Sequence, residues 1–197
     1  MVIILLGKVG GVCMRKHYIT LVLAFILTLM FCASCSAKLI RSNDGRFAFE
    51  TPDNWYYTRV GGGDSITDEV LTVARDKDTV VTLKRSNVYF KYKSFRDFSY
   101  AEKSQFRDNA IRQTTNNMQR LGYDARVIGS NIFEGAIAIS YNLFKGGQRF
   151  HMMENFSMKD YIIYSLSFTS NEYTDTEAAH VFMSLTADGM SFSQWLK

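Results

Sequence analysis

The sequence predicts an α+β domain in which an antiparallel β-sheet is flanked by two main helices. Three observations carry this expectation. Strand-like runs rich in β-branched and aromatic residues occupy much of residues 46–86 and 124–169. A long amphipathic pattern with three-to-four spacing lies between them, at residues 99–121, and a shorter one follows at residues 174–187. The short connections between neighbouring strand-like runs favour antiparallel pairing.

An N-terminal export signal precedes this domain. Arg15, Lys16 and His17 form a positive region, residues 18–31 form an uncharged apolar run, and small residues follow. This order is typical of a secretory signal peptide. The apolar run of about 14 residues is shorter than the roughly 18 to 20 that span a bilayer as a helix, although a short anchor helix is the alternative. Residues 1–13 do not fit a signal, and we interpret them as the result of an upstream start-codon assignment.

The signal ends in a sequence that resembles the lipobox of bacterial lipoproteins, in which small residues precede a lipid-modified cysteine. Ala33, Ser34 and Cys35 fit its last three positions, whereas Cys32 stands where that family usually has leucine. The resemblance implies that Cys35 is acylated and becomes the mature N-terminus. Acylation would anchor the chain stably, because two or more acyl chains hold a protein at a bilayer. Cleavage by ordinary signal peptidase after Ala37 is the alternative.

These interpretations divide the chain into a helical signal peptide at residues 1–34, a tether at residues 35–45 and a single α+β domain at residues 46–197. Removing 34 of the 197 residues leaves 163, which suits one domain. Ser36, directly after the cysteine, resembles the default signal that sends enterobacterial lipoproteins to the outer membrane. We therefore expect a membrane-anchored protein of the cell envelope, at the outer membrane and facing the periplasm.

Composition narrows the function further. Three of the 23 basic residues and none of the 19 acidic residues lie in the signal, which leaves 20 basic against 19 acidic residues in the mature chain. This balance gives no electrostatic reason to expect a nucleic-acid partner. The cysteines, Cys13, Cys32 and Cys35, all precede the domain. Their positions exclude a disulfide framework, a cysteine metal site and a cysteine nucleophile within the domain.

The first half of the domain is predicted to consist of strands and turns. The strand-like runs are residues 46–51, 55–60, 69–75 and 79–86. The last two form a hairpin around residues 76–78. The glycine triplet at residues 61–63 lacks the lysine and Ser/Thr of a phosphate-binding loop and precedes a strand, so we interpret it as a loop.

Segment 87–98 interleaves five aromatic residues with three basic ones. Such a mixture suits single-stranded nucleic acid, a membrane surface, or a connection whose aromatic rings pack on the core while its charges stay in water. Aromatic and arginine side chains dominate binding energy at interfaces. We therefore hypothesise that the segment faces a protein partner, with Tyr89, Tyr92 and Phe95 as its anchors.

The long helix is predicted from its cap and its buried stripe. Ser99 and Glu102 form a capping box at its start, and Gly122 stands where a left-handed C-terminal cap belongs. The stripe consists of Phe106, Ala110, Thr114, Met118 and Leu121.

Four strand-like segments follow the long helix, at residues 124–129, 132–143, 148–158 and 161–169, with hairpin turns at residues 146–147 and 159–160. A second capping box at residues 174–177 opens the shorter helix, and Asp188 with Gly189 ends it. Phe192, Trp195 and Leu196 then form a packed tail.

Candidate chemistry is scarce. His151 with Met152 and Met153 has the ligand types of a soft copper site, but in an alternating strand Met152 faces away from the other two. His180 has Ser184 rather than a ligand four residues later. No strained serine-nucleophile motif occurs in the sequence. We therefore expect no catalytic residue, no metal and no cofactor.

The order of strands, helix, strand meander and short helix resembles the PsbP-like superfamily, which includes the photosystem protein PsbP and bacterial DcrB-type lipoproteins. Pro52 and Trp55 match its opening motif, and Ser191 with Phe192 matches its closing motif. The resemblance implies an antiparallel sheet flanked by helices, and it brings no catalytic residue with it. Fold alone does not imply function.

The favoured function is that of an exported, lipid-anchored, non-enzymatic binding or accessory module of the envelope. Its partners would be the membrane, through the lipid on Cys35, and an envelope protein. The alternative is a periplasmic small-ligand carrier or enzyme that uses a pocket between the sheet and the helices.

Overall fold

The computed structural model describes residues 37–59 and 67–197. The predicted signal peptide, Cys35 and the glycine triplet at residues 61–63 lie outside the described residues.

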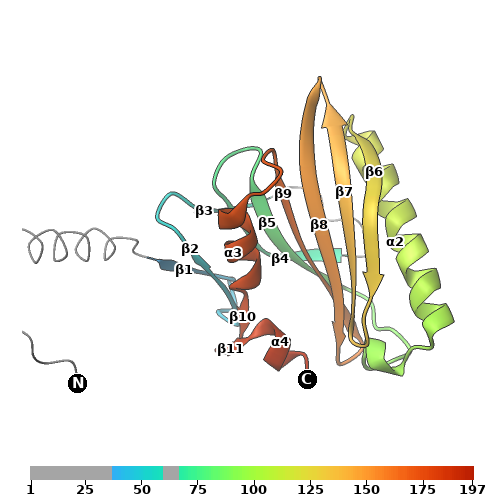
Figure 1. The fold of residues 1–197 in the computed structure, drawn as a ribbon. Coiled ribbons are helices and arrows are strands. Elements are labelled where there is room, and N and C mark those ends of the chain that lie inside the picture. The colour runs from blue at the N-terminus through green and yellow to red at the C-terminus, as the bar shows by residue number, and fades with distance from the viewer. Residues whose placement is uncertain (1–36, 60–66) are drawn as a thin grey trace, which may run out of the picture. The chain divides into compact units, whose positions relative to one another are not determined.

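A seven-stranded antiparallel sheet forms the centre of the domain (Figure 1). In spatial order its strands are β3 (Tyr56–Thr58), β4 (Thr67–Ala74), β5 (Val80–Ser86), β9 (Ile162–Ser170), β8 (Gln148–Lys159), β7 (Ala136–Lys145) and β6 (Asp124–Ile132). The predicted hairpin and the four later strands are present, but β6 extends to Ile132 and β7 begins at Ala136 rather than at residue 132. Gly146 and Gly147 both have positive φ, 58° and 79°, as the tight turn between β7 and β8 requires. The β8–β9 turn lies one residue later than predicted, at Asp160 and Tyr161.

A smaller sheet is formed by both ends of the domain. Its order is β1 (Lys38–Arg41), β2 (Phe47–Thr51), β10 (Thr186–Ala187) and β11 (Met190–Ser191). Residues 35–45 were expected to form a tether, but β1 pairs with β2 along its whole length. The reason is the apolar pair Leu39 and Ile40: Ile40 packs against the core while Leu39 faces outward, which is the alternation of a strand.

The long helix is α2 (Tyr100–Arg120), and its predicted caps are confirmed. The Ser99 hydroxyl accepts a hydrogen bond from the Glu102 amide, and the Glu102 carboxylate accepts one from the Ser99 amide. Gly122 has a φ of 83°. Phe106, Ala110 and Met118 pack in the core as expected. Leu121 is exposed instead, because it lies beyond the last helical turn as the C-cap.

The second helix, α3 (Thr176–Met183), is shorter than predicted. Its N-cap is Asp175 rather than Thr174. It ends at Met183 rather than at Asp188, because Thr186 and Ala187 leave the helix to pair with β2. A single 3-10 turn, η1 (Phe95–Asp97), precedes α2, and α4 (Phe192–Trp195) closes the chain.

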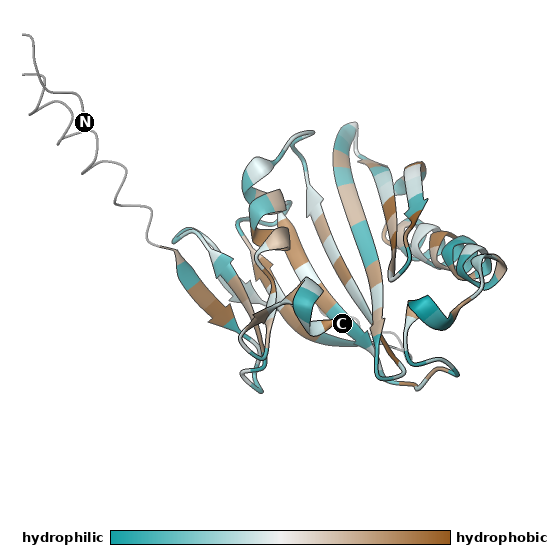
Figure 2. Cartoon of the chain, turned by 60° about the horizontal axis from the view of Figure 1, so that its bottom comes forward, coloured by the Kyte–Doolittle hydropathy of each residue, from teal (hydrophilic) through white to brown (hydrophobic). Residues whose placement is uncertain are grey.

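The two helical layers cover opposite faces of the central sheet (Figure 1). One core joins α2 to β7 and β8, and the other joins α3, α4 and β2 to β4, β5 and β9. Strand β9 serves both, since Ile163 belongs to the α2 core whereas Tyr164 and Leu166 belong to the α3 core. Figure 2 shows the resulting alternation of apolar and polar residues along the strands. The predicted fold class is confirmed: an antiparallel sheet flanked by helices.

Among the described helices, none combines the length and the apolar character needed to span a membrane.

Candidate functional site

Phe95 belongs to the core and is not a surface anchor. Its side chain is 0% exposed, and its ring centroid lies 5.2 Å from that of Phe98 and 5.0 Å from that of Phe106 on α2. The turn η1 folds the ring inward, with the Ser94 hydroxyl accepting a hydrogen bond from the Arg96 amide at 3.2 Å. The hypothesis that Phe95 contacts a partner is therefore wrong, because the α2 core already buries this side chain.

Tyr92 lies half-buried beside the start of α2. Its ring centroid is 4.7 Å from that of Phe98, and its hydroxyl donates a hydrogen bond to the Glu102 carboxylate at 2.7 Å. The hydrogen bond from Tyr92, followed by those from Ser99, holds the pKa of Glu102 at about 2. Tyr92 thus fastens segment 87–98 to the capping box of α2, so that only part of its ring is available to a partner.

Tyr89 is the one predicted anchor that projects into solvent, with 78% of its side chain exposed. The backbone beside it is held in place, since the Phe90 amide donates to the Tyr161 carbonyl at 2.8 Å. The Tyr161 amide in turn donates to the Lys93 carbonyl at 3.4 Å. These bonds join segment 87–98 to the β8–β9 turn, where Tyr161 is also exposed and has a φ of 70°.

Two further exposed aromatic residues lie at the same end of the domain. Tyr100 opens α2, and Phe133 follows β6 in the β6–β7 turn. The Lys103 ammonium of α2 links these elements by donating to the Glu134 carbonyl at 2.7 Å. We call the set Tyr89, Tyr100, Phe133 and Tyr161 the aromatic end. It occupies the lower end of the sheet in Figure 1, where the β6–β7 and β8–β9 turns meet segment 87–98.

Sequence reasoning missed three of these four residues. Tyr100, Phe133 and Tyr161 lie at the start of a helix or in turns, positions that the core does not readily bury. The sequence signal that could have identified them is a large aromatic residue at a helix start or in a turn.

Charges at the aromatic end are mixed. Lys93 lies 3.6 Å from the carboxylate of Asp160, and Lys91 and Arg96 are exposed. The acidic side chains of Asp97 and Glu102 accept hydrogen bonds from backbone amides at the starts of η1 and α2. The surface therefore combines exposed rings with both signs of charge and does not form a strong positive field.

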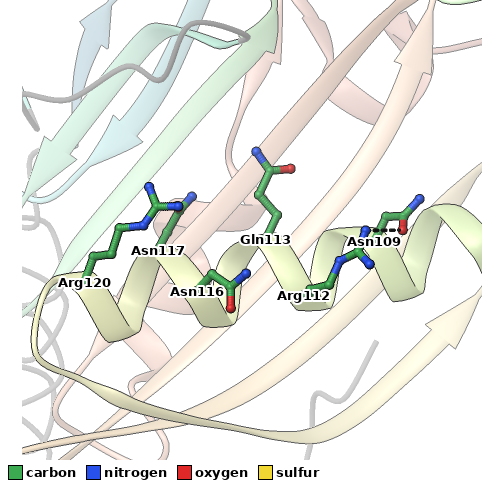
Figure 3. Close-up of a pocket in the computed structure, with 6 residues that line it drawn as sticks. All are labelled: Asn109, Arg112, Gln113, Asn116, Asn117 and Arg120. Atoms are coloured by element: carbon green, nitrogen blue, oxygen red, sulfur yellow. Dashed lines mark hydrogen bonds between the residues drawn. The ribbon is translucent and has the colours of Figure 1, made fainter.

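A polar pocket of about 280 Å³ lies along α2 (Figure 3). Arg112 donates a hydrogen bond to the Asn109 amide oxygen at 3.1 Å. The lining of this pocket includes Asn109, Arg112, Gln113, Asn116, Asn117 and Arg120. They supply amides and guanidinium groups from one helix, and none of them is a nucleophile or a carboxylate. This pocket could contact a polar or anionic group, but these six residues give it no general acid or base.

A buried carboxyl group ties α2 to the sheet. Glu154 on β8 accepts hydrogen bonds from Thr114 of α2 and from Ser165 of β9, both at 3.0 Å. Burial raises the pKa of Glu154, opposed by these two hydrogen bonds and by the charge of Lys84 on β5. Burial and the nearby Glu154 also raise the pKa of Tyr141 on β7.

We expect Glu154→Gln to stabilise the domain at pH 8 relative to the wild type. The folded-state pKa of Glu154 is raised, so its stabilising contribution is fully present below the unfolded value near 4.5 and is lost as pH rises through the folded value. Glutamine removes this dependence, which for one group reaches at most about 1.4 kcal/mol per pH unit. Urea unfolding from pH 4.5 to 8 measures the difference. If the difference in the free energy of unfolding between the variant and the wild type did not grow with pH, the prediction would be wrong.

His151, the other titratable group singled out by the sequence, is buried on β8. Its ring meets Tyr173 edge-on, with 4.5 Å between the centroids, and burial followed by the charge of Arg149 lowers its pKa. In residues 37–59 and 67–197, no cluster of three or more His, Cys, Asp or Glu side chains has the arrangement of a metal site.

Comparison with known proteins identifies a solved structure with a similar fold. No family model matches the sequence, and no curated protein matches it. The structure is similar to that of cyanobacterial PsbP (CyanoP) from Synechocystis sp. PCC 6803, with a TM-score of 0.55 and 14% identity over 92% of this chain and 98% of that one. This likeness supports the PsbP-like fold, and at this identity it shows the fold alone.

Two other solved structures are less similar. LpqN, described as involved in cell envelope biogenesis of Mycobacterium tuberculosis, gives a TM-score of 0.32 at 14% identity over 77% of this chain and 90% of that one. A Bacteroides thetaiotaomicron protein gives 0.41 at 15% identity over 76% of this chain and 48% of that one.

Proposed function

We propose that this protein is an exported, lipid-anchored accessory module of the cell envelope that binds a protein partner through its aromatic end and catalyses no reaction. The observation that carries the proposal is the gathering of four exposed aromatic residues, Tyr89, Tyr100, Phe133 and Tyr161, from four separate segments of the chain. Exposed apolar groups gathered in this way mark interaction sites more often than single surface residues do.

The chemistry of the aromatic end favours a protein over a nucleic acid or a lipid surface. Protein interfaces are enriched in tyrosine, phenylalanine and arginine. Nucleic acids and anionic membranes instead require a surplus of positive charge. At this end Lys93 lies beside Asp160, and Asp97, Glu102 and Glu134 offset the remaining cations.

The proposed export and anchoring rest on the order of Arg15, the apolar run and Cys35 in the sequence. The PsbP-like fold is compatible with such a role but does not determine it. The alternative function is a ligand carrier or enzyme with a pocket between sheet and helices. The pocket on α2 does not support it, because the lining residues given above all belong to one helix.

A capture experiment tests the partner surface. The full chain is expressed in its host with an affinity tag, cross-linked in the envelope and purified, and the captured proteins are quantified. We expect the double variant Tyr89→Ala, Phe133→Ala to lose at least about tenfold of one specific partner, since a hot-spot aromatic residue contributes roughly 2 kcal/mol or more. Both side chains are exposed, so the melting temperature should stay unchanged.

Tyr56→Ala is the matched control, because Tyr56 is an exposed tyrosine on β3, at the opposite edge of the sheet from β6. It should capture the partner as the wild type does. Equal capture by the double variant and the control would show that the aromatic end is not the binding surface.

A further inference from the structure

The first strand begins very close to the predicted lipid-bearing cysteine. Only Ser36 and Ala37 separate Cys35 from β1, which starts at Lys38. Three residue steps of extended chain reach at most about 11 Å. A lipid on Cys35 would therefore hold the start of β1 within about 11 Å of the modified cysteine, at the membrane surface.

Strand β1 is too firmly held to serve as extra tether. Lys38 pairs with Thr51 on β2, and the Thr51 hydroxyl donates to the Lys38 carbonyl at 3.3 Å. The Lys38 ammonium donates to the Asp53 carbonyl at 2.8 Å, and Ile40 packs against the α3 core. If β1 left the sheet to lengthen the tether, all of these contacts would be lost.

The surface around β1 carries exposed apolar side chains. Leu39 is 55% exposed and lies opposite Glu50 on β2. The Ser184 hydroxyl contacts both the amide and the carbonyl of Glu50 at 3.0 Å, so the end of α3 continues the same row. Met183, next to Ser184, is 78% exposed. By the alternation of a strand Arg41 projects to the same side as Leu39, whereas Lys38 projects to the side of Ile40, where its ammonium reaches the Asp53 carbonyl.

We propose that this β1 surface, consisting of Leu39, Arg41 and Met183, rests on the bilayer that holds the lipid anchor. The inference rests on the proposed acylation of Cys35. Leu39 and Met183 enter the interfacial region, and the Arg41 guanidinium lies at the level of the lipid phosphates. A partner protein is not the occupant, because the short tether leaves little room for one between β1 and the bilayer.

This orientation assigns separate roles to two parts of the domain. In both Figure 1 and Figure 2 the start of β1 lies on the opposite side of the domain from the turns that form the aromatic end. A domain resting on β1 therefore keeps Tyr89 and Phe133 clear of the lipid and open to a partner in the periplasm.

Fluorescence quenching tests the orientation. The full chain carrying Met183→Cys is produced in its host, purified with its lipid and inserted into phospholipid vesicles that contain a headgroup-linked nitroxide. The acylated mature chain has no other free thiol, because its only cysteine is Cys35. A fluorophore therefore labels position 183 alone. Tyr100→Cys, an exposed position on α2, is the matched control.

We expect quenching at position 183 to exceed quenching at position 100 at least threefold. Equal quenching of both labels on a chain that carries acyl groups by mass spectrometry would overturn the orientation and leave the anchor intact. A chain that carries no acyl group by mass spectrometry and partitions into the membrane no more than a Cys35→Ser variant does would overturn both the anchor and the orientation.

Discussion

Replacing Phe95 with alanine is expected to lower the free energy of unfolding by about 3–5 kcal/mol, the usual cost of removing a buried aromatic ring. For a domain of this size, the melting temperature should fall by roughly 6 to 20 °C. Circular dichroism of Phe95→Ala during heating measures the change.

The size of this effect follows from the position of the ring. Phe95 is fully buried, and its edge-to-face contacts with Phe98 and Phe106 join segment 87–98 to α2. Phe106 continues the contact to Phe156 on β8, with 5.4 Å between the ring centroids. Alanine would leave a cavity between α2, η1 and the sheet, because neighbouring side chains in a packed core relax only partially.

Tyr89→Ala is the matched control in the same segment. Tyr89 is exposed, and a surface substitution of this kind usually changes stability by about 0.5 kcal/mol or less. If both variants melted at the wild-type temperature, segment 87–98 would not be part of the core. If Tyr89→Ala melted as low as Phe95→Ala, its ring would be packed rather than available to a partner.

The contrast between these two aromatic residues shows what the sequence could predict. Segment 87–98 has no regular period over most of its length, so nothing in the spacing says which ring turns inward. The direction of Phe95 is set by the turn η1, a three-residue element that Ser94 and Asp97 cap. Where local signals were strong, prediction succeeded: the Ser99 capping box and Gly122 mark both ends of α2.

The two ends of the domain were harder to predict. Strand β1 needs β2 as a partner besides its own apolar pair, and β10 pairs with β2 from 138 residues away, as the hydrogen bond from the Thr186 hydroxyl to the Ala48 carbonyl shows. Such pairing forms only in the assembled fold, because the packing around a strand outweighs the intrinsic strand propensity of its residues. The aromatic end was predicted only in part for the same reason, since it combines residues from four segments.

Asp175→Ala is expected to cost about 3–5 kcal/mol, because it removes the N-cap of α3 and the most buried of the four carboxylates around Arg75, and leaves buried hydrogen-bond donors without their acceptor. The Asp175 side chain is 1% exposed and lies 3.0 Å from the Arg75 guanidinium. It also accepts hydrogen bonds from the Ser170 hydroxyl at 2.6 Å and from the Ala178 amide at 2.8 Å. One carboxylate thus caps α3 and fixes it to Arg75, directly after β4, and to the end of β9.

Two further variants separate the charge from the cap. Asp175→Asn keeps a good N-cap and should fall between the wild type and Asp175→Ala in urea unfolding. Glu172→Ala removes another carboxylate of the same cluster, 3.1 Å from Arg75 but with 59% of its side chain exposed, and should cost at most about 1 kcal/mol. Both acids contact the same arginine. If Glu172→Ala and Asp175→Ala lowered the free energy of unfolding equally, the burial and the capping role of Asp175 would contribute nothing to stability. In that case α3 would be held by its apolar face alone.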